Sequence, residues 1–153
     1  MPLLLKTGLC LQVHIMDFRE FLKNNIVYLD GGMGTLLQEQ GLRPGECPER
    51  WNIDNPNAIT KIHREYFDAG SNVVCTNTFG ANCLKFSDDE LESVIRKAIT
   101  NARIARQQTY AKQEKFIALD IGPTGKLLKP LGDLDFEDAV SVFAKTVKIG
   151  VKL

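Results

Sequence analysis

The sequence predicts an α/β protein built on a parallel sheet. Three short apolar runs, at residues 26–30, 72–76 and 116–121, are typical of buried strands, and a helical pattern follows each of them. Serial alternation of strand and helix implies parallel strands joined by right-handed crossovers. Each strand also opens into polar or glycine-rich residues, which predicts a single ligand site at one end of the sheet.

The first third of the chain carries short helical patterns around the first strand. Residues 17–24 predict a helix that caps the bottom of the sheet, because it precedes that strand. Residues 33–40 favour a helical turn that ends at Gly41. Residues 43–52 hold two prolines and a glycine, so we expect a long loop there, with Trp51 anchoring it on the body of the protein.

Two longer helices are predicted in the middle of the chain. Asn55–Pro56 begins the first, since asparagine caps a helix and proline suits its first position, and Gly70 ends it. Its apolar stripe includes His63, which we expect to be packed rather than catalytic. Residues 87–90, Ser-Asp-Asp-Glu, form a capping box that begins a second helix running to about Tyr110.

The two ends of the chain suggest where the domain lies. Residues 1–15 are expected to be an upstream extension or a loose tail, because Met16 is a more natural start for the helix that follows. An ordinary N-terminal segment packed on the domain is the alternative. A last helix is predicted from Asp135 to residue 149, ended by Gly150, and residues 151–153 resemble the start of a fourth strand. We therefore expect residues 16–153 to be the N-terminal part of a domain.

Composition limits the classes of partner. Nineteen basic and nineteen acidic residues cancel, so the net charge directs the chain neither to nucleic acid nor to a membrane surface. No run approaches the roughly 20 apolar residues of a membrane span. Free thiols without a secretion signal favour a cytoplasmic location. No metal site is predicted, because no pair has Cys-x-x-Cys spacing among the four cysteines, Cys10, Cys47, Cys75 and Cys83.

The residues that follow the strands point to a small zwitterionic ligand. Asp30 could accept hydrogen bonds from an ammonium group, and the backbone at Gly31 and Gly32 could donate to a carboxylate. The later strands add amide and hydroxyl groups, and neither Rossmann nor P-loop spacing is present. Two alternatives remain: the three stretches are only tight turns, or Asp30 is the general base of a small independent enzyme.

Three motifs in order carry a resemblance to a known family. They are Leu-Asp-Gly-Gly-Met-Gly-Thr at 29–35, Thr-Asn-Thr-Phe-Gly-Ala-Asn at 76–82 and Ile-Gly-Pro-Thr-Gly at 121–125. Together they resemble the homocysteine-binding domain of the homocysteine S-methyltransferase family. Leu-Gly-Asp-Leu at 131–134 makes the N-terminal module of cobalamin-dependent methionine synthase the most similar branch. The resemblance runs from about Asp17 to Gly150.

The resemblance implies a (β/α)8 barrel whose strand ends bind homocysteine, of which this chain holds about the first three βα units and a short N-terminal helix. In that family a zinc ion held by three cysteines coordinates the substrate sulfur as a thiolate. The thiolate then takes a methyl group from methylcobalamin, recharged by methyltetrahydrofolate, or from another donor. Substrate-binding roles carry over to matching positions here, and no catalytic role does: Asp30, Gly31, Gly32, Asn77, Thr78 and Gly122.

The chain departs from the family in one respect. The family's zinc cysteines and a substrate-site glutamate lie on later strands, and a complete barrel needs roughly 250 residues. We therefore expect a truncated, inactive N-terminal fragment of a homocysteine S-methyltransferase, with open barrel edges that could self-associate. The alternative is a small non-catalytic α/β module that binds an amino acid or a protein partner. The sequence does not specify the methyl donor, the true start or the oligomeric state.

Overall fold

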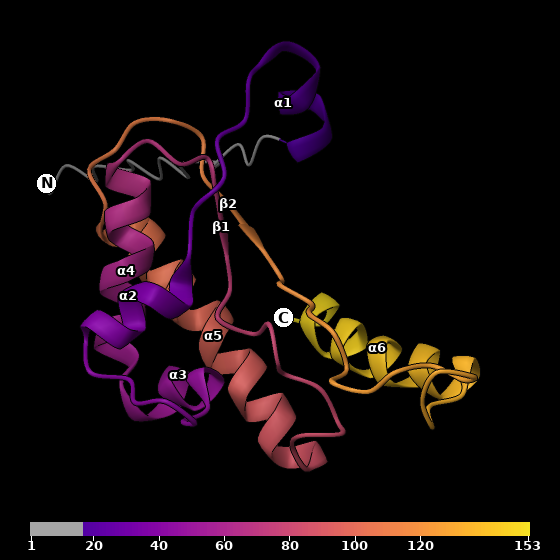
Figure 1. Ribbon diagram of the computed structural model, residues 1–153. Coiled ribbons are helices and arrows are strands. Elements are labelled where there is room, and N and C mark those ends of the chain that lie inside the picture. The colour runs from indigo at the N-terminus through magenta and orange to yellow at the C-terminus, as the bar shows by residue number, and fades with distance from the viewer. Residues whose placement is uncertain (1–16) are drawn as a thin grey trace, which may run out of the picture.

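The computed structural model describes residues 17–153 (Figure 1). The prediction for residues 1–15 lies outside this range. In chain order the elements are α1 (Phe18–Asn24), α2 (Met33–Glu39), η1 (Pro48–Arg50), α3 (Trp51–Asp54), α4 (Pro56–Asp68), β1 (Val73–Cys75), α5 (Asp88–Gln108), β2 (Phe116–Ala118) and α6 (Phe136–Val151).

The sheet is parallel, as predicted. β1 and β2 pair in the register Val73↔Phe116, Val74↔Ile117 and Cys75↔Ala118. The predicted first strand, at 26–30, contributes only a single parallel bridge, between Leu29 and Val73. The Tyr28 amide donates to the side-chain Oδ1 of Asn72 at 3.1 Å, whereas the Asp30 amide donates to the backbone carbonyl of Val73 at 3.0 Å.

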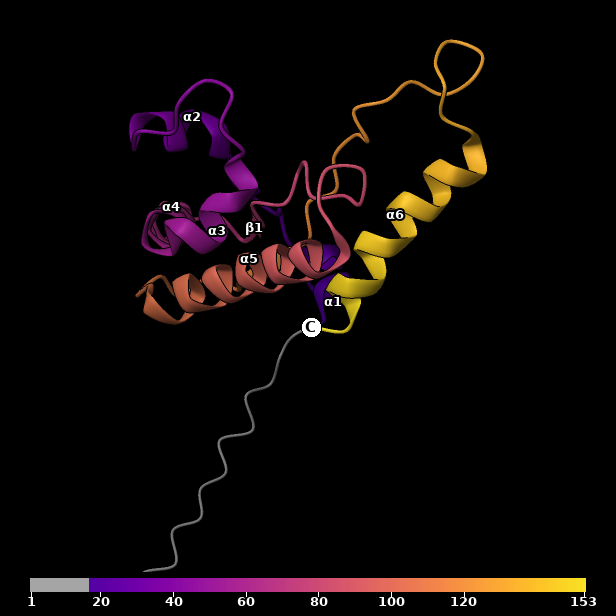
Figure 2. The same cartoon turned by 90° about the horizontal axis from the view of Figure 1, so that it is seen from below.

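Two long helices cover the sheet and bury its apolar side chains. α4 and α5 lie side by side (Figure 2). The stripe of α4 that sequence periodicity predicted is buried at Ile59, Ile62, His63 and Phe67. α5 approaches closely because small residues, Ala98, Ala102 and Ala105, face the body. Phe67 and Val74 join two of these alanines in one core cluster.

The predicted loop at 43–52 is partly helical. Pro48 begins η1, where a missing backbone N–H costs nothing, and α3 follows directly. Trp51 is a packed anchor, as expected, and rests on the apolar cluster that includes Leu37 and Ile59. Two prolines and a glycine therefore mark helix starts and turns here rather than a continuous loop.

The end of the last helix also differs from the prediction. α6 continues through Gly150 to Val151, so residues 151–153 do not begin a strand. Gly150 does not end the helix. It lets α6 pack closely against Leu119, because a Cβ added at Gly150 would lie 2.5 Å from Cδ2 of Leu119. Among residues 17–153, no helix is long and apolar enough to cross a membrane.

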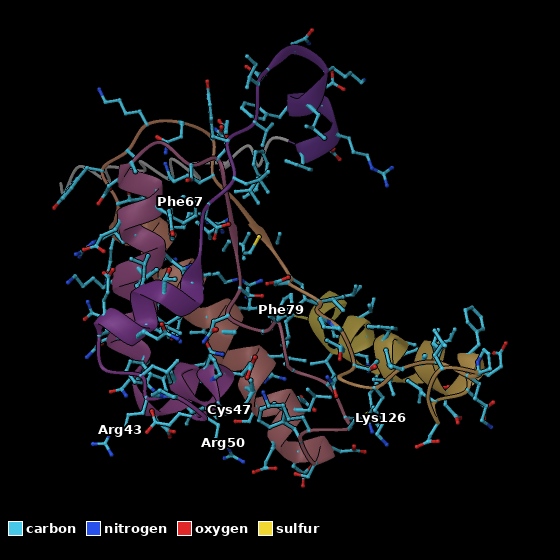
Figure 3. All side chains as sticks on the ribbon, in the orientation of Figure 1. Arg43, Cys47, Arg50, Phe67, Phe79 and Lys126 are labelled. Atoms are coloured by element: carbon cyan, nitrogen blue, oxygen red, sulfur yellow. The ribbon has the colours of Figure 1, made fainter. Side chains whose placement is uncertain are left out.

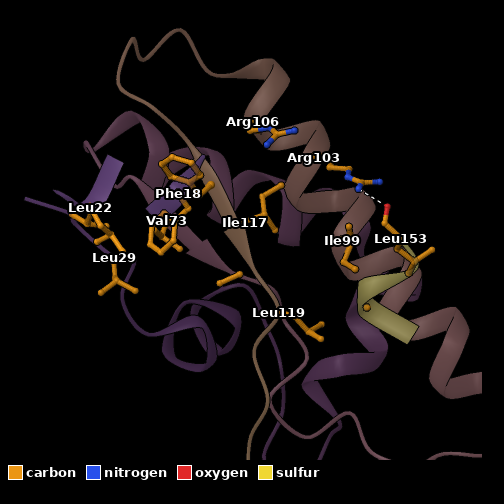
Figure 4. A pocket seen from close by; sticks show the side chains of 14 residues that line it. Phe18, Leu22, Leu29, Val73, Ile99, Arg103, Arg106, Ile117, Leu119 and Leu153 are labelled. Atoms are coloured by element: carbon orange, nitrogen blue, oxygen red, sulfur yellow. Dashed lines mark hydrogen bonds between the residues drawn. The ribbon is translucent and has the colours of Figure 1, made fainter. Parts of the chain in front are cut away.

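One side of the sheet faces a large apolar cavity. Within residues 17–153, β2 pairs only with β1, and its other side opens into a space of about 1030 Å³. α1 borders this space, with the ring of Phe18 packed edge-on to Phe116 at 4.9 Å between centroids. α5 and the end of α6 border it opposite, where Arg103 donates to the carbonyl of Leu153 at 2.6 Å (Figure 4).

Candidate functional site

A smaller cavity of about 340 Å³ lies at the carboxyl ends of the strands. The segments after Leu29, β1 and β2 meet there, as expected for a parallel sheet. Loop and η1 residues close its side. Its lining comprises Asp30, Gly31, Gly32, Met33, Gly34, Pro48, Glu49, Cys75, Thr76, Asn77, Phe79 and Asp120.

Asp30 is fixed at the mouth of the first segment. Its amide donates to the Val73 carbonyl at 3.0 Å, and its Oδ2 accepts from the Cys75 amide at 2.8 Å. Burial raises the pKa of Asp30 above its ordinary value, although the hydrogen bonds from Cys75 oppose that shift. The Cys75 thiol also bonds this carboxylate, which lines the cavity and so can meet a ligand there.

A second carboxylate, Asp120, faces the same cavity from the segment after β2. Burial and the nearby charge of Asp30 both raise the pKa of Asp120. Burial, followed by the charges of these two acids, raises the pKa of the Cys75 thiol to about 12. Cys75 therefore stays a neutral thiol at pH 7 and is no nucleophile, while the paired carboxylates make the cavity attractive to a cation.

Gly31 and Gly32 line the cavity, and Tyr66 packs over them. The Tyr66 hydroxyl donates to the Gly32 carbonyl at 3.2 Å. A Cβ added at Gly31 would lie 2.9 Å from that hydroxyl oxygen, so a side chain there would displace Tyr66. Because Gly31 has no side chain, Tyr66 of α4 can pack against the turn beside Asp30.

Asn77 also lines the cavity, and its side chain is used structurally. Its Nδ2 donates to the Pro48 carbonyl at 2.7 Å. Its own carbonyl accepts from Nδ2 of Asn52 at 2.7 Å, and that same Nδ2 donates to the carbonyl of Glu49 at 2.9 Å. These bonds fasten the β1 segment to η1 and α3, so Asn77 positions one wall of the cavity.

Thr78 and Gly122 do not line the cavity, and their predicted substrate-binding roles stay predictions. Thr78 is buried, and its hydroxyl donates to the Asp120 carbonyl at 2.7 Å. The Thr76 hydroxyl lies 2.7 Å from it and accepts from the Asp120 amide at 3.2 Å. Gly122 donates to the Phe79 carbonyl at 2.9 Å, and a Cβ there would lie 2.4 Å from that oxygen. Both residues hold Asp120 and Phe79 in place.

Glu49 is a cavity residue that sequence reasoning missed. It is almost fully buried; one carboxylate oxygen accepts from the Gly80 amide at 2.7 Å and the other from Nζ of Lys85 at 2.8 Å. Burial alone would raise the pKa of Glu49, but bonds from Cys47, Lys85 and Gly80 outweigh it and hold the pKa below its usual value. Cys47, labelled in Figure 3, belongs to this network and donates its thiol to Oε2 of Glu49 at 2.9 Å.

The described residues do not fit a zinc site of the family type. Within residues 17–153, no group of three or more histidine, cysteine, aspartate or glutamate side chains lies close enough to hold a metal ion. The cysteines of this part, Cys47, Cys75 and Cys83, are unpaired thiols on separate segments. The cavity offers the carboxylates of Asp30 and Asp120, a third carboxylate, Glu49, that is already bonded within the protein, exposed backbone, and the exposed ring of Phe79.

Comparison with solved structures matches the fold. The chain superimposes on the homocysteine methyltransferase MmuM from Escherichia coli, oxidized form, with a TM-score of 0.72 and 21% identity, covering 88% of this chain and 52% of that one. The metallated form gives a TM-score of 0.72 and 20% identity, with 88% and 53% covered. The predicted fold class is confirmed: α/β, with the first units of a (β/α)8 TIM barrel.

Comparison of sequences identifies the family. Methionine synthase of Mycobacterium leprae is 31% identical over 131 residues, which cover 78% of this chain and 11% of that protein. Methionine synthase of Mycobacterium tuberculosis is 30% identical over the same length. The chain thus spans about a tenth of these relatives and about half of the solved structures. A family model for homocysteine S-methyltransferase matches residues 27–152, and the chain belongs to this family.

Proposed function

We propose that the cavity around Asp30 binds the amino-acid end of homocysteine, as part of a homocysteine S-methyltransferase. The observation that carries the proposal is the pair of carboxylates, Asp30 and Asp120, beside the open backbone of Gly31 and Gly32. The Asp30 carboxylate, which lines the cavity, is suited to an ammonium group. Amide groups of the glycine turn are suited to a carboxylate.

The methyl-transfer chemistry is not assigned to residues of this chain. When bound, zinc lowers the pKa of a coordinated thiol and so supplies a thiolate nucleophile at neutral pH. The described residues do not provide three ligands for it. Zinc, the methyl donor (methylcobalamin recharged by methyltetrahydrofolate, or a simpler donor) and a cytoplasmic location therefore stay predictions for the whole protein. We expect the isolated chain to be inactive in methyl transfer.

Calorimetric titration of homocysteine tests the binding role of Asp30. We expect Asp30→Asn to weaken binding by about 1.5–3 kcal/mol, or roughly 10- to 150-fold, because a charge-assisted hydrogen bond is lost. Asparagine keeps an oxygen for the Cys75 amide, so the local fold should persist.

Asp133→Asn is the matched control, because Asp133 is exposed and does not line the cavity. It should bind homocysteine as the unmodified chain does. Equal affinities for the Asp30 variant and this control would mean that the Asp30 carboxylate only shapes the turn.

A second candidate function is a module that associates through its open face. The observation that favours it is the apolar cavity of about 1030 Å³ beside β2, bordered by Leu22 and Leu29, which are about half and two-thirds exposed. Apolar surface of this extent is typical of an interface. Under this alternative, copies of the chain pair through that face without catalysis.

A further inference from the structure

A third cavity, of about 470 Å³, lies in the groove between α4 and α5. It shares no lining residue with the cavity around Asp30, and its volume is within the usual range for small-ligand sites. One helical stripe of each helix forms its walls, so the groove is fixed by the same packing that builds the core. Nothing in the proposed function uses this groove.

The groove concentrates positive charge. Lys61 and Arg64 of α4 and Lys97 of α5 line it, and none of its described lining residues is acidic. Lys61 makes one long ion pair, with Glu65 at 3.7 Å. Within residues 17–153, Arg64 and Lys97 form no ion pair, although Arg64 is only partly exposed. Arg64 and Lys97 therefore have no carboxylate partner among the described residues and can pair with an external anion.

The inner residues of the groove are neutral amides. Asn101 is 2% exposed and donates its Nδ2 to the Asn52 carbonyl at 3.0 Å. Asn52 also lines the groove and is fully buried, yet its Oδ1 has no hydrogen-bond partner among the described residues. A buried polar atom without a partner is uncommon, and a bound water would supply the missing donor here, because an ionised oxyanion offers only acceptors. No inner group neutralises the three cations.

We propose that the α4–α5 groove binds a small oxyanion that carries at least two negative charges. Arg64 offers the planar fork that matches a phosphate or carboxylate, and the two lysines add point charges on both walls. Thr60 and Gln108 supply neutral hydrogen-bonding groups beside them. A diphosphate and a tricarboxylate share this chemistry.

Titration calorimetry of the full chain with inorganic pyrophosphate, and separately with citrate, tests the proposal at low salt. The groove variant R64Q/K97Q should lose at least tenfold in pyrophosphate affinity. Gln108→Glu, which adds a carboxylate to the groove without removing a cation, should lose affinity as well. Raising the salt concentration should weaken binding to the unmodified chain. Tighter binding of pyrophosphate than of citrate would identify phosphate as the preferred group, and equal binding would identify a general oxyanion site.

The matched control is R43Q/K148Q, which removes the same charges from exposed positions outside the groove. It should bind pyrophosphate as the unmodified chain does, and thermal unfolding should show both double variants folded. Equal losses in the groove and control variants would overturn the proposal, because binding would then follow net charge alone. Absence of binding of either anion at millimolar concentration would overturn it too.

Discussion

At the scale of single residues, His63 has a measurable consequence for stability. Its side chain is fully buried in α4, and neither ring nitrogen has a hydrogen-bond partner among the described residues. Burial lowers the pKa of His63 from 6.5 to about 4. The folded chain therefore keeps the imidazole neutral where the unfolded chain protonates it.

The free energy of unfolding should thus fall as the pH drops from about 6.5 to about 4. Above pH 6.5 the imidazole is neutral in both the folded and the unfolded chain, so its protonation does not lower the free energy of unfolding. Between these pH values the unfolded chain binds a proton that the folded chain does not. The free energy of unfolding falls by about 3 kcal/mol over this range.

Denaturant unfolding of the chain and of His63→Gln between pH 7.5 and pH 4.5 measures this effect. Glutamine cannot titrate, so the difference between the two proteins isolates His63 from the carboxylates that also titrate in this range. The unmodified chain should lose stability faster on acidification. A constant difference across the range would contradict the prediction.

The residue scale also shows what the sequence could reveal of the site. Asp30, Gly31, Gly32 and Asn77 follow strands, and the carboxyl ends of parallel strands meet, so their convergence was predictable. The same logic extends to Asp120, which follows a strand in the same way as Asp30 and also lines the cavity. Glu49 could not have been found, because it reaches the cavity from a loop whose path depends on tertiary hydrogen bonds.

At the scale of elements, the capping box of α5 carries a local prediction. Glu90 Oε2 accepts from the Ser87 amide at 3.3 Å and from the Ser87 hydroxyl at 3.0 Å. Ser87→Ala should lower the free energy of unfolding by about 1 kcal/mol, since the cap of the longest described helix is lost. Urea unfolding gives the value.

Ser93→Ala provides the control within the same helix. Ser93 is exposed and lies in the helix interior, where alanine is the better helix former. It should leave stability unchanged or slightly raised. A loss equal to that of Ser87→Ala would show that the cap contributes nothing.

The elements also show why prediction failed where it did. The helix start at Ser87 was predictable from its capping box, and the start after Asn55 from Pro56 at the first position, although the Asn55 side chain makes no cap hydrogen bond. The end of α6 was not, since Gly150 is selected by contact with Leu119, a residue distant in sequence. The Tyr28 amide likewise bonds a distant partner, the Asn72 side chain, which the sequence pattern does not reveal. Features set by adjacent residues can be predicted from the sequence, whereas features set by contacts between distant residues cannot.

At the scale of the whole molecule, the open face beside β2 predicts association. Leu22 of α1 lies at this face and is about half exposed. If copies pair there, Leu22→Lys should weaken self-association at least tenfold, because burying an ammonium costs more than the lost contact alone. Sedimentation over a range of concentrations measures the monomer fraction.

Leu84→Lys is the matched control, since Leu84 has similar exposure and does not line this cavity. It should associate as the unmodified chain does. Monomeric behaviour of the unmodified chain at high concentration would reject association through this face.

Hydrogen bonds among three asparagines link segments that are distant in sequence, so we expect these segments to unfold together. Asn101 bonds to Asn52, 49 positions away, and Asn52 bonds to Asn77, 25 positions away. These contacts cannot form until distant segments have met, and none of them opens by fraying of one helix end. The Gly80 amide, held by Glu49 in the same assembly, should therefore exchange its hydrogen with solvent at the slow rate of global unfolding. A rate that matches loop opening would instead make the cavity wall an independently mobile unit.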